Sequence, residues 1–301
     1  PDEADSAEKM LASSFTALSL ISKQKEKSNQ SLTGSDNLFY CQYLVNRDLA
    51  KVIENKELLV EYQPIIDAFT GNVVGMESLV RWYDGSTQIL TPENLINHAE
   101  NIGLISQLGA LVCHEALLQT SYLHAEGLDI NVSINASAIE LKDPSYFERV
   151  SQEAHSLNID PHKIIIEITE TALLAKSPEV LSNIEKLRSI GIKIYLDDFG
   201  TGFTSFKTIS EFSIDGFKID KSFVQGCERD KTKRELIRCL VELAHALDLN
   251  ITAEGIETTK QLEFLFSQKE DLLLQGYLFA RPMPAAAISS YIHNSQNICG
   301  E

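Results

Sequence analysis

The sequence lacks the patterns that mark thiolate-metal, zinc-hydrolase and loop-type nucleotide sites. Its five cysteines are widely spaced and form no C-x-x-C pair, so neither a zinc knuckle nor a disulfide framework is indicated. The seven histidines include no H-x-x-x-H or H-E-x-x-H spacing, which leaves no zincin-type site. Neither G-x-G-x-x-G nor G-x-x-x-x-G-K-S/T occurs, which argues against a Rossmann or P-loop fold.

Positive charge and long apolar runs are also scarce. Lys and Arg number 26 against 43 Asp and Glu, which gives a formal net charge of −17. This balance argues against binding of a nucleic-acid polymer or an anionic membrane surface, because both require a basic face. No apolar run is long enough to span a membrane, and no signal peptide is recognisable. We expect a cytoplasmic catalytic domain from a longer protein, and a membrane anchor elsewhere in that protein stays open.

What the chain does contain is an alternation of strand-like and helix-like segments. Its 301 residues, 44% of them hydrophobic, suffice for one barrel of about 250 residues and an appendage. The expected helical stretches are 92–126, 144–157, 178–190, 231–247 and 258–268. The expected strands are Leu58–Ile66, Val73–Trp82, Ile130–Asn135, Lys163–Thr169, Ile192–Leu196, Gly216–Ile219, Asn250–Ala253 and Leu272–Phe279. This order predicts an α/β fold, and its spacing favours a closed (βα)8 TIM-like barrel over an open sheet.

The N-terminal part follows a different pattern. Apolar residues at helical spacing predict a helix at 6–21, and a polar loop follows at 22–36. A short apolar patch at Leu38–Tyr40 precedes a helix expected at 44–55. We therefore assign residues 1–43 to an N-terminal helix and linker, and residues 44–301 to the barrel.

Polar side chains lie at or near the ends of most expected strands. They are Glu77, Asn135, Glu167, Asp197, Asp198, Lys218, Glu254 and Gln275. An ionised carboxylate near a core is costly unless it is paired or bound to a metal. The C-terminal ends of barrel strands meet at one face, so these groups should converge. Acids, an amide and a lysine suit hard divalent cations and a phosphate ester, which predicts a metal-dependent phosphoesterase.

Taken singly, each segment has a second interpretation. Asp197-Asp198-Phe199-Gly200 fits a cation site or an ordinary turn equally well, and no glycine-rich loop or H-R-D supports a kinase. A helix N-terminus explains Glu170 but not Glu167, which lies inside the expected strand. Lys218 is either a structural ion-pair partner or a catalytic group, with catalysis slightly favoured. Arg81 is a surface residue or a phosphate or guanine clamp, and by itself it favours the surface.

Together these segments resemble the EAL domain, the cyclic di-GMP phosphodiesterase family. The matching stretches occur in family order across residues 45 to 292. They are Tyr62–Ile65, Met76–Trp82, Asn135–Ser137, Glu167–Glu170, Asp197–Gly202, Phe217–Asp220, Ala253–Thr258 and Gln275–Phe279. The resemblance implies a (βα)8-type barrel whose first strand is antiparallel to its neighbours.

The resemblance also implies roles for individual residues. Two Mg²⁺ or Mn²⁺ ions would be held by Glu77, Asn135, Glu167, Asp197, Asp198 and Glu254. The catalytic groups would be Lys218, which orients the attacking water, Glu254 as a general base, and Glu170, which tethers the loop after Asp197. The substrate would be positioned by Gln63, Glu77, Leu79, Arg81, Asp220, Glu257 and Gln275. The expected reaction opens cyclic di-GMP to linear pGpG.

Two departures from the family pattern bear on activity. The signature triplet reads Glu77-Ser78-Leu79 in place of Glu-Ala-Leu, and Ser78 should point away from Glu77 on a strand. The loop Phe203–Phe206 replaces the usual Tyr-Ser-Ser-Leu. All the acids, Asn135 and Lys218 are retained, so we predict a competent enzyme.

Other readings and partners stay open at this point. A non-catalytic cyclic di-GMP receptor is the alternative, with the altered loop as its support. Another phosphodiester substrate on the same barrel is a third reading, and it leaves Gln63 and Arg81 without a role. The resemblance implies a homodimer. Residues Ala4–Leu11 and Leu38–Tyr40 resemble the end of a GGDEF domain, which implies an upstream GGDEF or sensor domain.

Overall fold

The structure is a computed structural model that describes residues 49–84, 87–170, 172, 177–200, 213–267 and 272–298. The expected helix at 6–21, the loop at 22–36, the patch Leu38–Tyr40 and the loop Phe203–Phe206 lie outside these residues. The chain divides into two units, one of residues 1–59 and 80–111 and the other of residues 60–79 and 112–301. The second unit contains most of the barrel and all of the polar strand ends, whereas Leu59 of the first barrel strand and residues 80–84 of the second belong to the first unit.

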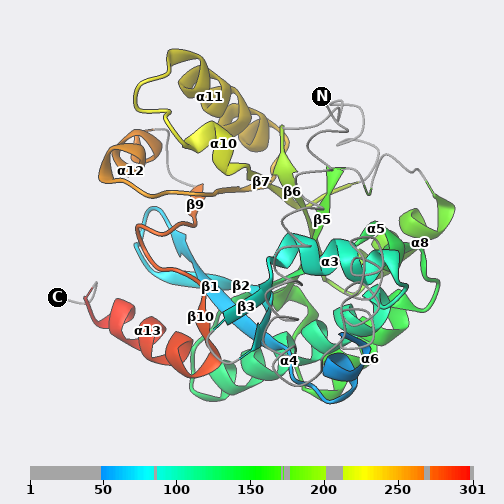
Figure 1. Cartoon of the computed structure of the whole chain (residues 1–301). Helices are drawn as coiled ribbons and strands as arrows, with labels where there is room; N and C mark the ends of the chain where they lie inside the picture. The colour runs from blue at the N-terminus through cyan, green and yellow to red at the C-terminus, as the bar shows by residue number, and fades with distance from the viewer. Residues whose placement is uncertain are drawn as a thin grey trace, which may run out of the picture. The chain divides into compact units, whose positions relative to one another are not determined.

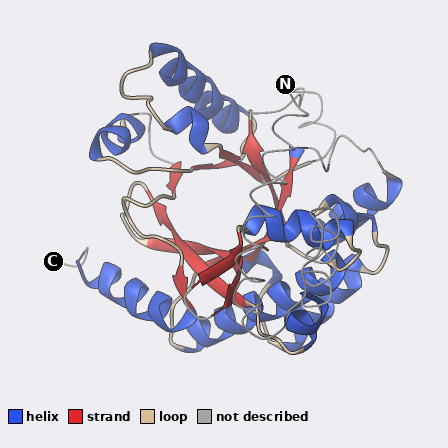
Figure 2. Cartoon of the chain, in the orientation of Figure 1, coloured by secondary structure: helices blue, strands red, loops and turns tan. Residues whose placement is uncertain are grey.

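The core of the second unit is a closed ring of eight strands (Figures 1 and 2). Their order around the ring is β1-β9-β8-β7-β6-β5-β4-β2, and β1 also pairs with β2. The ladders that join β2, β4, β5, β6, β7, β8 and β9 in turn are parallel, whereas β1 is antiparallel to β9. The strands are β1 (Leu59–Asp67), β2 (Val73–Asp84), β4 (Asn131–Ala136), β5 (Ile164–Thr169), β6 (Lys193–Phe199), β7 (Gly216–Ile219), β8 (Asn250–Ala253) and β9 (Leu272–Leu274). The predicted (βα)8-type barrel with an antiparallel first strand is confirmed.

The isoleucine run of β5 shows why these segments form barrel strands. Ile164, Ile166 and Ile168 are at most 1% exposed, and Ile165 and Glu167 on the opposite face are also buried. A strand covered on both faces favours β-branched residues throughout, because each of them packs on a pleated surface. Glu167 interrupts the apolar run on the face that points into the ring, where a charge needs partners.

Helices cover the outside of the ring in the second unit (Figure 2). Ser137 and Thr258 begin two of them with capping boxes, and Asp230 caps a third by accepting from Thr232 and Lys233. A short strand, β10 (Met283–Pro284), pairs with β1 just before the last helix. The helices that lie wholly in this unit are α5 (Ala138–Lys142), α6 (Tyr146–Ser156), η1 (Pro161–Lys163), α8 (Pro178–Ser189), α10 (Lys221–Val224), α11 (Lys231–Ala246), α12 (Thr259–Phe266) and α13 (Ala285–Ile298). Helix α4 (Ile105–Ala125) begins in the first unit, which includes residues 105–111, and ends in the second.

The first unit, where it is described, contains a helical segment at 49–54 and a small hairpin. The last residues of β2 pair antiparallel with β3 (Thr87–Leu90), an element that the sequence analysis did not predict. Helix α3 (Pro92–Asn101) follows, with Thr91 as its N-cap and Pro92 in its first turn.

Two predicted elements were wrong in extent. The expected helix at 92–126 is two helices, because the chain turns at Gly103, whose φ is +74°, before α4 begins at Ile105. The expected strand Leu272–Phe279 ends at Leu274, and Gln275 to Phe279 form a turn instead. None of the helices among the described residues combines the length and apolarity needed to cross a bilayer.

Candidate active site

The predicted polar residues lie at successive strand ends of the ring. Register places Asn135 of β4 beside Glu167 of β5, and Thr169 of β5 beside Asp197 of β6. Lys218 comes from β7, and Glu254 directly follows β8. Parallel strands present their C-terminal ends on one side, so residues far apart in sequence reach a common centre.

Lys218 lies at that centre and is 1% exposed. Its Nζ lies 2.6 Å from Glu254 Oε1 and 2.9 Å from Glu167 Oε2. It also lies 3.1 Å from Glu77 Oε2 and 3.5 Å from Asp197 Oδ1. One ammonium group thus contacts carboxylates from four different strand ends.

Two amide side chains hold Glu77 from the other side. Asn135 Nδ2 donates to Glu77 Oε1 at 2.9 Å. This hydrogen bond leaves the side-chain oxygen Oδ1 of Asn135 available as a metal ligand. Gln275 Nε2 donates to Glu77 Oε2 at 2.7 Å and to Gln63 Oε1 at 3.1 Å. Gln63 in turn donates to the carbonyl of Ala280 at 3.0 Å. These bonds fix the orientation of the Glu77 carboxylate before any ligand arrives.

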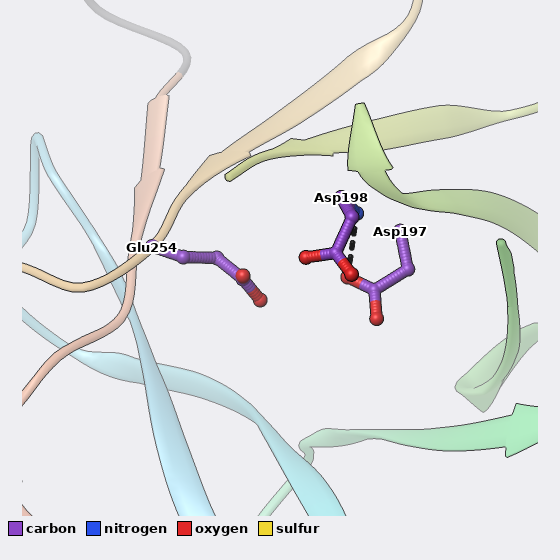
Figure 3. A group of neighbouring side chains, drawn as sticks. All are labelled: Asp197, Asp198 and Glu254. Atoms are coloured by element: carbon purple, nitrogen blue, oxygen red, sulfur yellow. Dashed lines mark hydrogen bonds between the residues drawn. The ribbon is translucent and has the colours of Figure 1, made fainter. Parts of the chain in front are cut away.

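Asp197, Asp198 and Glu254 form a carboxylate cluster, with one oxygen of each within 4.8 Å of the others (Figure 3). Adjacent residues on a regular strand point to opposite faces. Here the β6–β7 register shifts between Leu196 and Phe199, and Asp198 has a left-handed φ of 54°. This bulge turns both Asp carboxylates toward Glu254, as Figure 3 shows. Asp tolerates the left-handed region better than most residues do, and the Asp198 N–H donates to Asp197 Oδ1 at 3.0 Å.

The chain segment after the two aspartates is held by Glu170. Its Oε1 accepts from the backbone N–H of Gly200 at 2.8 Å, and the Glu170 side chain is buried. Gly200 has φ +96°, and a Cβ there would lie 3.0 Å from the ring of Phe223. Only glycine combines this φ with so little space. Glu170 and Phe223 therefore limit how far the Asp197–Asp198 bulge can move.

A second close contact joins the segments that carry Glu254 and Gln275. A Cβ at Gly276 would lie 2.1 Å from the carbonyl oxygen of Ile256 and 2.3 Å from its nitrogen. Hydrogen bonds from Ile256 N to the Gln275 carbonyl, 3.2 Å, and from Leu278 N to the Ile256 carbonyl, 2.9 Å, hold this contact. These contacts hold the backbone that carries Glu254 in a fixed position relative to the backbone that carries Gln275.

Comparison with known proteins decides the family. The family model described as EAL domain matches residues 46–282. The chain belongs to the EAL domain family. The cyclic di-GMP phosphodiesterase PdeR of Escherichia coli is 35% identical over 251 residues, which are 83% of this chain and 38% of PdeR. The cyclic di-GMP phosphodiesterase NbdA of Pseudomonas aeruginosa is 31% identical over 249 residues, which are 82% of this chain and 32% of NbdA. The chain thus spans about a third of the length of these curated relatives.

Solved structures agree with this assignment. The PaMucR phosphodiesterase in complex with c-di-GMP has a TM-score of 0.75 and 32% identity, covering 80% of this chain and 98% of that one. An EAL domain protein from Listeria monocytogenes has a TM-score of 0.71 and 29% identity, covering 81% of this chain and 96% of that one. The barrel and its order of strands are therefore those of EAL domains.

The electrostatics of this EAL domain are dominated by excess negative charge. Burial raises the pKa of Glu254 to about 8, and the charges of Asp197 and Glu77 add to this rise while Lys218 opposes it. Burial and the neighbouring Asp197 and Asp220 raise the pKa of Asp198 to about 6. Burial also raises the pKa of Glu167 well above its ordinary value, although Lys218 opposes the rise.

The two best-paired groups are shifted toward their charged forms. Burial alone would raise the pKa of Glu77, but the Lys218 charge and the hydrogen bonds from Gln275 and Asn135 lower it overall. Burial alone would lower the pKa of Lys218, but the carboxylates of Asp197, Glu167 and Glu254 raise it well above the usual value. Lys218 is therefore a fixed positive charge that stabilises only part of the surrounding negative charge.

The residues present suit divalent cations of the hard type. The raised pKa values of Asp198 and Glu254 mean that added positive charge would be stabilised at this point. Every donor in the Asp197–Asp198–Glu254 cluster is a carboxylate oxygen, and such ligands suit Mg²⁺ and Mn²⁺ better than soft metals. The chemistry of the donor set therefore agrees with the predicted metal site.

The remaining predicted residues differ in their relation to this centre. The Asp220 side chain is hydrogen-bonded to Asp198, and it also caps α10 by accepting from Ser222 N at 3.0 Å. Leu79 lies two residues beyond Glu77 on β2 and is half-buried. Glu257 has an exposed side chain, and its backbone N–H donates to Gln261 Oε1 at 2.8 Å. Arg81 belongs to the first unit, where its Nη1 donates to the carbonyl of Val80 at 3.0 Å.

Some of the residues that position the site were not predicted. Phe223 covers Gly200, and Gly255 and Gly276 allow the close backbone contacts beside Glu254 and Gln275. Gly255 has φ +69°, and a Cβ there would lie 2.4 Å from Lys221 Cβ. The sequence did carry a signal, since Gly255 directly follows Glu254 and Gly276 directly follows Gln275. Sequence alone did not indicate which atoms would approach them.

Proposed function

We propose that this EAL domain is a metal-dependent phosphodiesterase that hydrolyses cyclic di-GMP to linear pGpG. The observation that carries the proposal is the convergence of Glu77, Glu167, Asp197 and Glu254 on Lys218 at one end of an EAL-type barrel. Relatives that are named cyclic di-GMP phosphodiesterases support the choice of substrate. A structure of a related phosphodiesterase with c-di-GMP supports it further.

The metal would be held by the residues that the cluster and its neighbours supply. One ion is assigned to Glu77, Asn135, Glu167 and Asp197, and a second to Asp197, Asp198 and Glu254. When bound, two Mg²⁺ or Mn²⁺ ions lower the pKa of a water and neutralise charge on the phosphoryl oxygens. The hydrogen bonds from the side-chain amides of Asn135 and Gln275 hold the Glu77 carboxylate in one orientation.

In the proposed reaction a water attacks phosphorus in line with the 3′ oxygen of the sugar, which leaves. Side chains of the protein orient this water, accept its proton and hold the site in place. Lys218 orients this water and stabilises negative charge that develops in the transition state, because it is buried and always protonated. Glu254 is the proposed acceptor of the proton of this water; burial raises its pKa to about 8 when no cation is bound, and bound cations would lower that pKa and favour the carboxylate that a base requires. Glu170 contributes by holding Gly200 and with it the two aspartates.

The dinucleotide is assigned to a second set of side chains. We propose that Gln63, Leu79, Arg81, Asp220, Glu257 and Gln275, together with Glu77, position its bases, sugars and phosphates. Gln63 and Gln275 are already ordered by their mutual hydrogen bond, so binding costs little side-chain entropy there. Asp220 is fixed as the cap of α10.

The deciding experiment is hydrolysis of cyclic di-GMP by the purified chain with Mg²⁺ or Mn²⁺, with chromatographic separation of the products and an EDTA control. We expect metal-dependent pGpG from the wild type. Glu77→Ala and Asp197→Ala should each abolish turnover, because each removes a metal ligand. Asp129→Asn is the matched control, since Asp129 pairs with Lys163 at 2.7 Å with its side chain 78% exposed.

The outcomes separate the possible functions. Undiminished hydrolysis in either alanine variant would refute the metal assignment. Tight binding of cyclic di-GMP without pGpG at saturating metal would show a receptor. The next variant would then replace the loop Phe203–Phe206 with the usual Tyr-Ser-Ser-Leu. Cleavage of another phosphodiester in preference to cyclic di-GMP would change the substrate and keep the chemistry.

Assembly and domain context are further parts of the proposal. We propose that the domain forms a homodimer, that residues 44–301 are the EAL-type barrel, and that residues 1–43 are the tail of an upstream GGDEF or sensor domain. The small share of each curated relative that the chain covers agrees with a multidomain parent. Light scattering coupled to size exclusion tests the dimer, and a mass equal to one chain would reject it. A cytoplasmic location is proposed because cyclic di-GMP is an intracellular nucleotide.

A further inference from the structure

The contacts of Lys218 exceed what an ordinary buried ion pair requires. An ammonium group has three N–H donors, yet Lys218 Nζ has four carboxylate oxygens within 3.5 Å. The four acids come from β2, β5, β6 and the end of β8, so the lysine joins strand ends around most of the ring. A lysine that served only to satisfy one buried acid would need a single partner.

The same carboxylates are those assigned to the metal ions. Glu77, Glu167, Asp197 and Glu254 each direct one oxygen at Lys218, and each is a proposed ligand. Asp197 and Glu254 also belong to the three-carboxylate cluster shown in Figure 3. A divalent ion held by these residues would share its ligands with the ammonium. Two cations at such close range repel one another in a buried site.

The surroundings give Lys218 no other way to reduce this repulsion. It is fully buried, and its stem lies in β7 between Phe217 and Ile219, which are 0% exposed. Leaving this position would require the ammonium to give up its contacts with all four carboxylates. The ammonium therefore stays among the acids whether or not metal binds.

We propose that Lys218 is the internal counter-ion of this site, which holds the four carboxylates together when the barrel folds and weakens metal binding by competing for their oxygens. The inference rests on the proposed metal site and adds a role that orientation of a water does not require. It accounts for a domain that can fold before it acquires metal. It also keeps metal affinity below what the ligand set alone would give.

The test is the variant Lys218→Met, which removes the charge and keeps the length of the side chain. In EDTA we expect its Tm to fall by roughly 10 °C relative to wild type, because four buried acids lose their shared partner. By isothermal titration calorimetry we expect Mn²⁺ to bind about tenfold more tightly than it binds the wild type. An unchanged Tm in EDTA, or Mn²⁺ affinity that is equal or weaker, would overturn the inference.

Lys163→Met is the matched control. Lys163 lies outside the cluster and pairs with Asp129 at 2.7 Å, with its own side chain 26% exposed. Loss of this surface pair should leave Mn²⁺ affinity unchanged and the Tm within about 2 °C of wild type. A lysine-to-methionine effect that is unrelated to the acids would appear in both variants, and that result would also reject the proposal.

A second variant covers the case in which K218M does not fold. The double variant K218M/E167Q removes one negative charge together with the positive charge, so the proposal requires it to fold. K218M refolded with Mn²⁺ should fold as well, because the ion replaces the missing charge. A chain that stays unfolded under both conditions would refute the counter-ion role.

The inference and the proposed function fail in different ways. If the wild type gives no pGpG from cyclic di-GMP, the phosphodiesterase proposal is rejected while the Mn²⁺ comparison of the two lysine variants still stands. If the wild type gives pGpG but K218M binds Mn²⁺ no more tightly, only the competition is rejected.

Discussion

Substitution of Gly276 by alanine tests the rigid contact between the segments that carry Glu254 and Gln275. The added Cβ would lie 2.1 Å from the Ile256 carbonyl oxygen, 2.3 Å from its nitrogen and 2.7 Å from its carbonyl carbon. An ordinary contact begins at 3.4 Å, so the two backbones must separate by about 1 Å. No side-chain rotamer can relieve this overlap, because all three atoms belong to the backbone.

The expected size of the effect follows from this displacement. Overpacking typically costs about 1–3 kcal/mol, and the hydrogen bond from Leu278 N to Ile256 is worth about 1 kcal/mol more. We expect the free energy of unfolding to fall by about 3 kcal/mol, or a Tm lower by roughly 6–12 °C. A shift of about 1 Å at Glu254 and Gln275 should reduce kcat for cyclic di-GMP about a hundredfold.

The assay combines urea denaturation, followed by circular dichroism, with hydrolysis kinetics at a temperature where the variant is folded. Gly226→Ala is the control, because Gly226 has φ +83° but no atom within 4 Å of an added Cβ. It should lose about 1–2 kcal/mol of stability from backbone strain alone and keep wild-type kcat. Wild-type stability and turnover in the Gly276→Ala variant would refute the view that this contact positions the site.

Three further predictions concern single contacts and metal. Ser78→Ala removes a buried hydrogen bond from Ser78 Oγ to the Ser133 carbonyl, 2.8 Å, and should lower the free energy of unfolding by about 1 kcal/mol in urea titrations. Hydrolysis should be unchanged, since that hydroxyl points away from Glu77, and a lost activity would show that our account of the altered triplet is wrong. Glu170→Gln keeps the shape of the side chain but weakens the bond to Gly200 N–H, so kcat should fall about tenfold with the protein still folded. Mn²⁺ added to EDTA-treated protein should raise the Tm in proportion to the logarithm of its concentration, and a flat response in differential scanning calorimetry would contradict the metal site.

Most of the barrel could be predicted because its strands are short apolar segments that end in polar residues. The β5 isoleucine run and the acid at Glu167 indicated both a buried strand and a site on its inner face. The end of β9 could not be read in this way, because Leu272–Phe279 is apolar apart from Gln275 and Gly276. Its termination depends on a backbone contact with Ile256, which is distant in sequence. The break at Gly103 was visible as a glycine, but a helix tolerates one glycine, so the residue alone did not decide it.

The convergence of several polar strand ends was predictable, whereas the individual contacts between their side chains were not. The sequence indicated that Glu77, Asn135, Glu167 and Glu254 would converge, because parallel strands share one end. It did not indicate that Lys218 would contact four of the acids, or that Gln275 would bridge Glu77 and Gln63. Such contacts depend on side-chain reach across the ring, which no local pattern encodes. The left-handed Asp198 belongs to the same class, since the bulge that turns both aspartates inward arises from the β6–β7 pairing.

The closure of the ring has a consequence for how the domain is made. The ring closes where β1 pairs with β9, for example Ile66 with Leu274. The first barrel strand to leave the ribosome therefore cannot form this pairing until the last strand has been synthesised. Until then β1 and β8 each present an unpaired edge, and Gln275 has not yet been synthesised to hold Glu77. Contacts of such long sequence separation make folding slow and leave open edges prone to association. A chain truncated anywhere before β9 should therefore not yield a smaller working enzyme, but an aggregating fragment whose acids never meet.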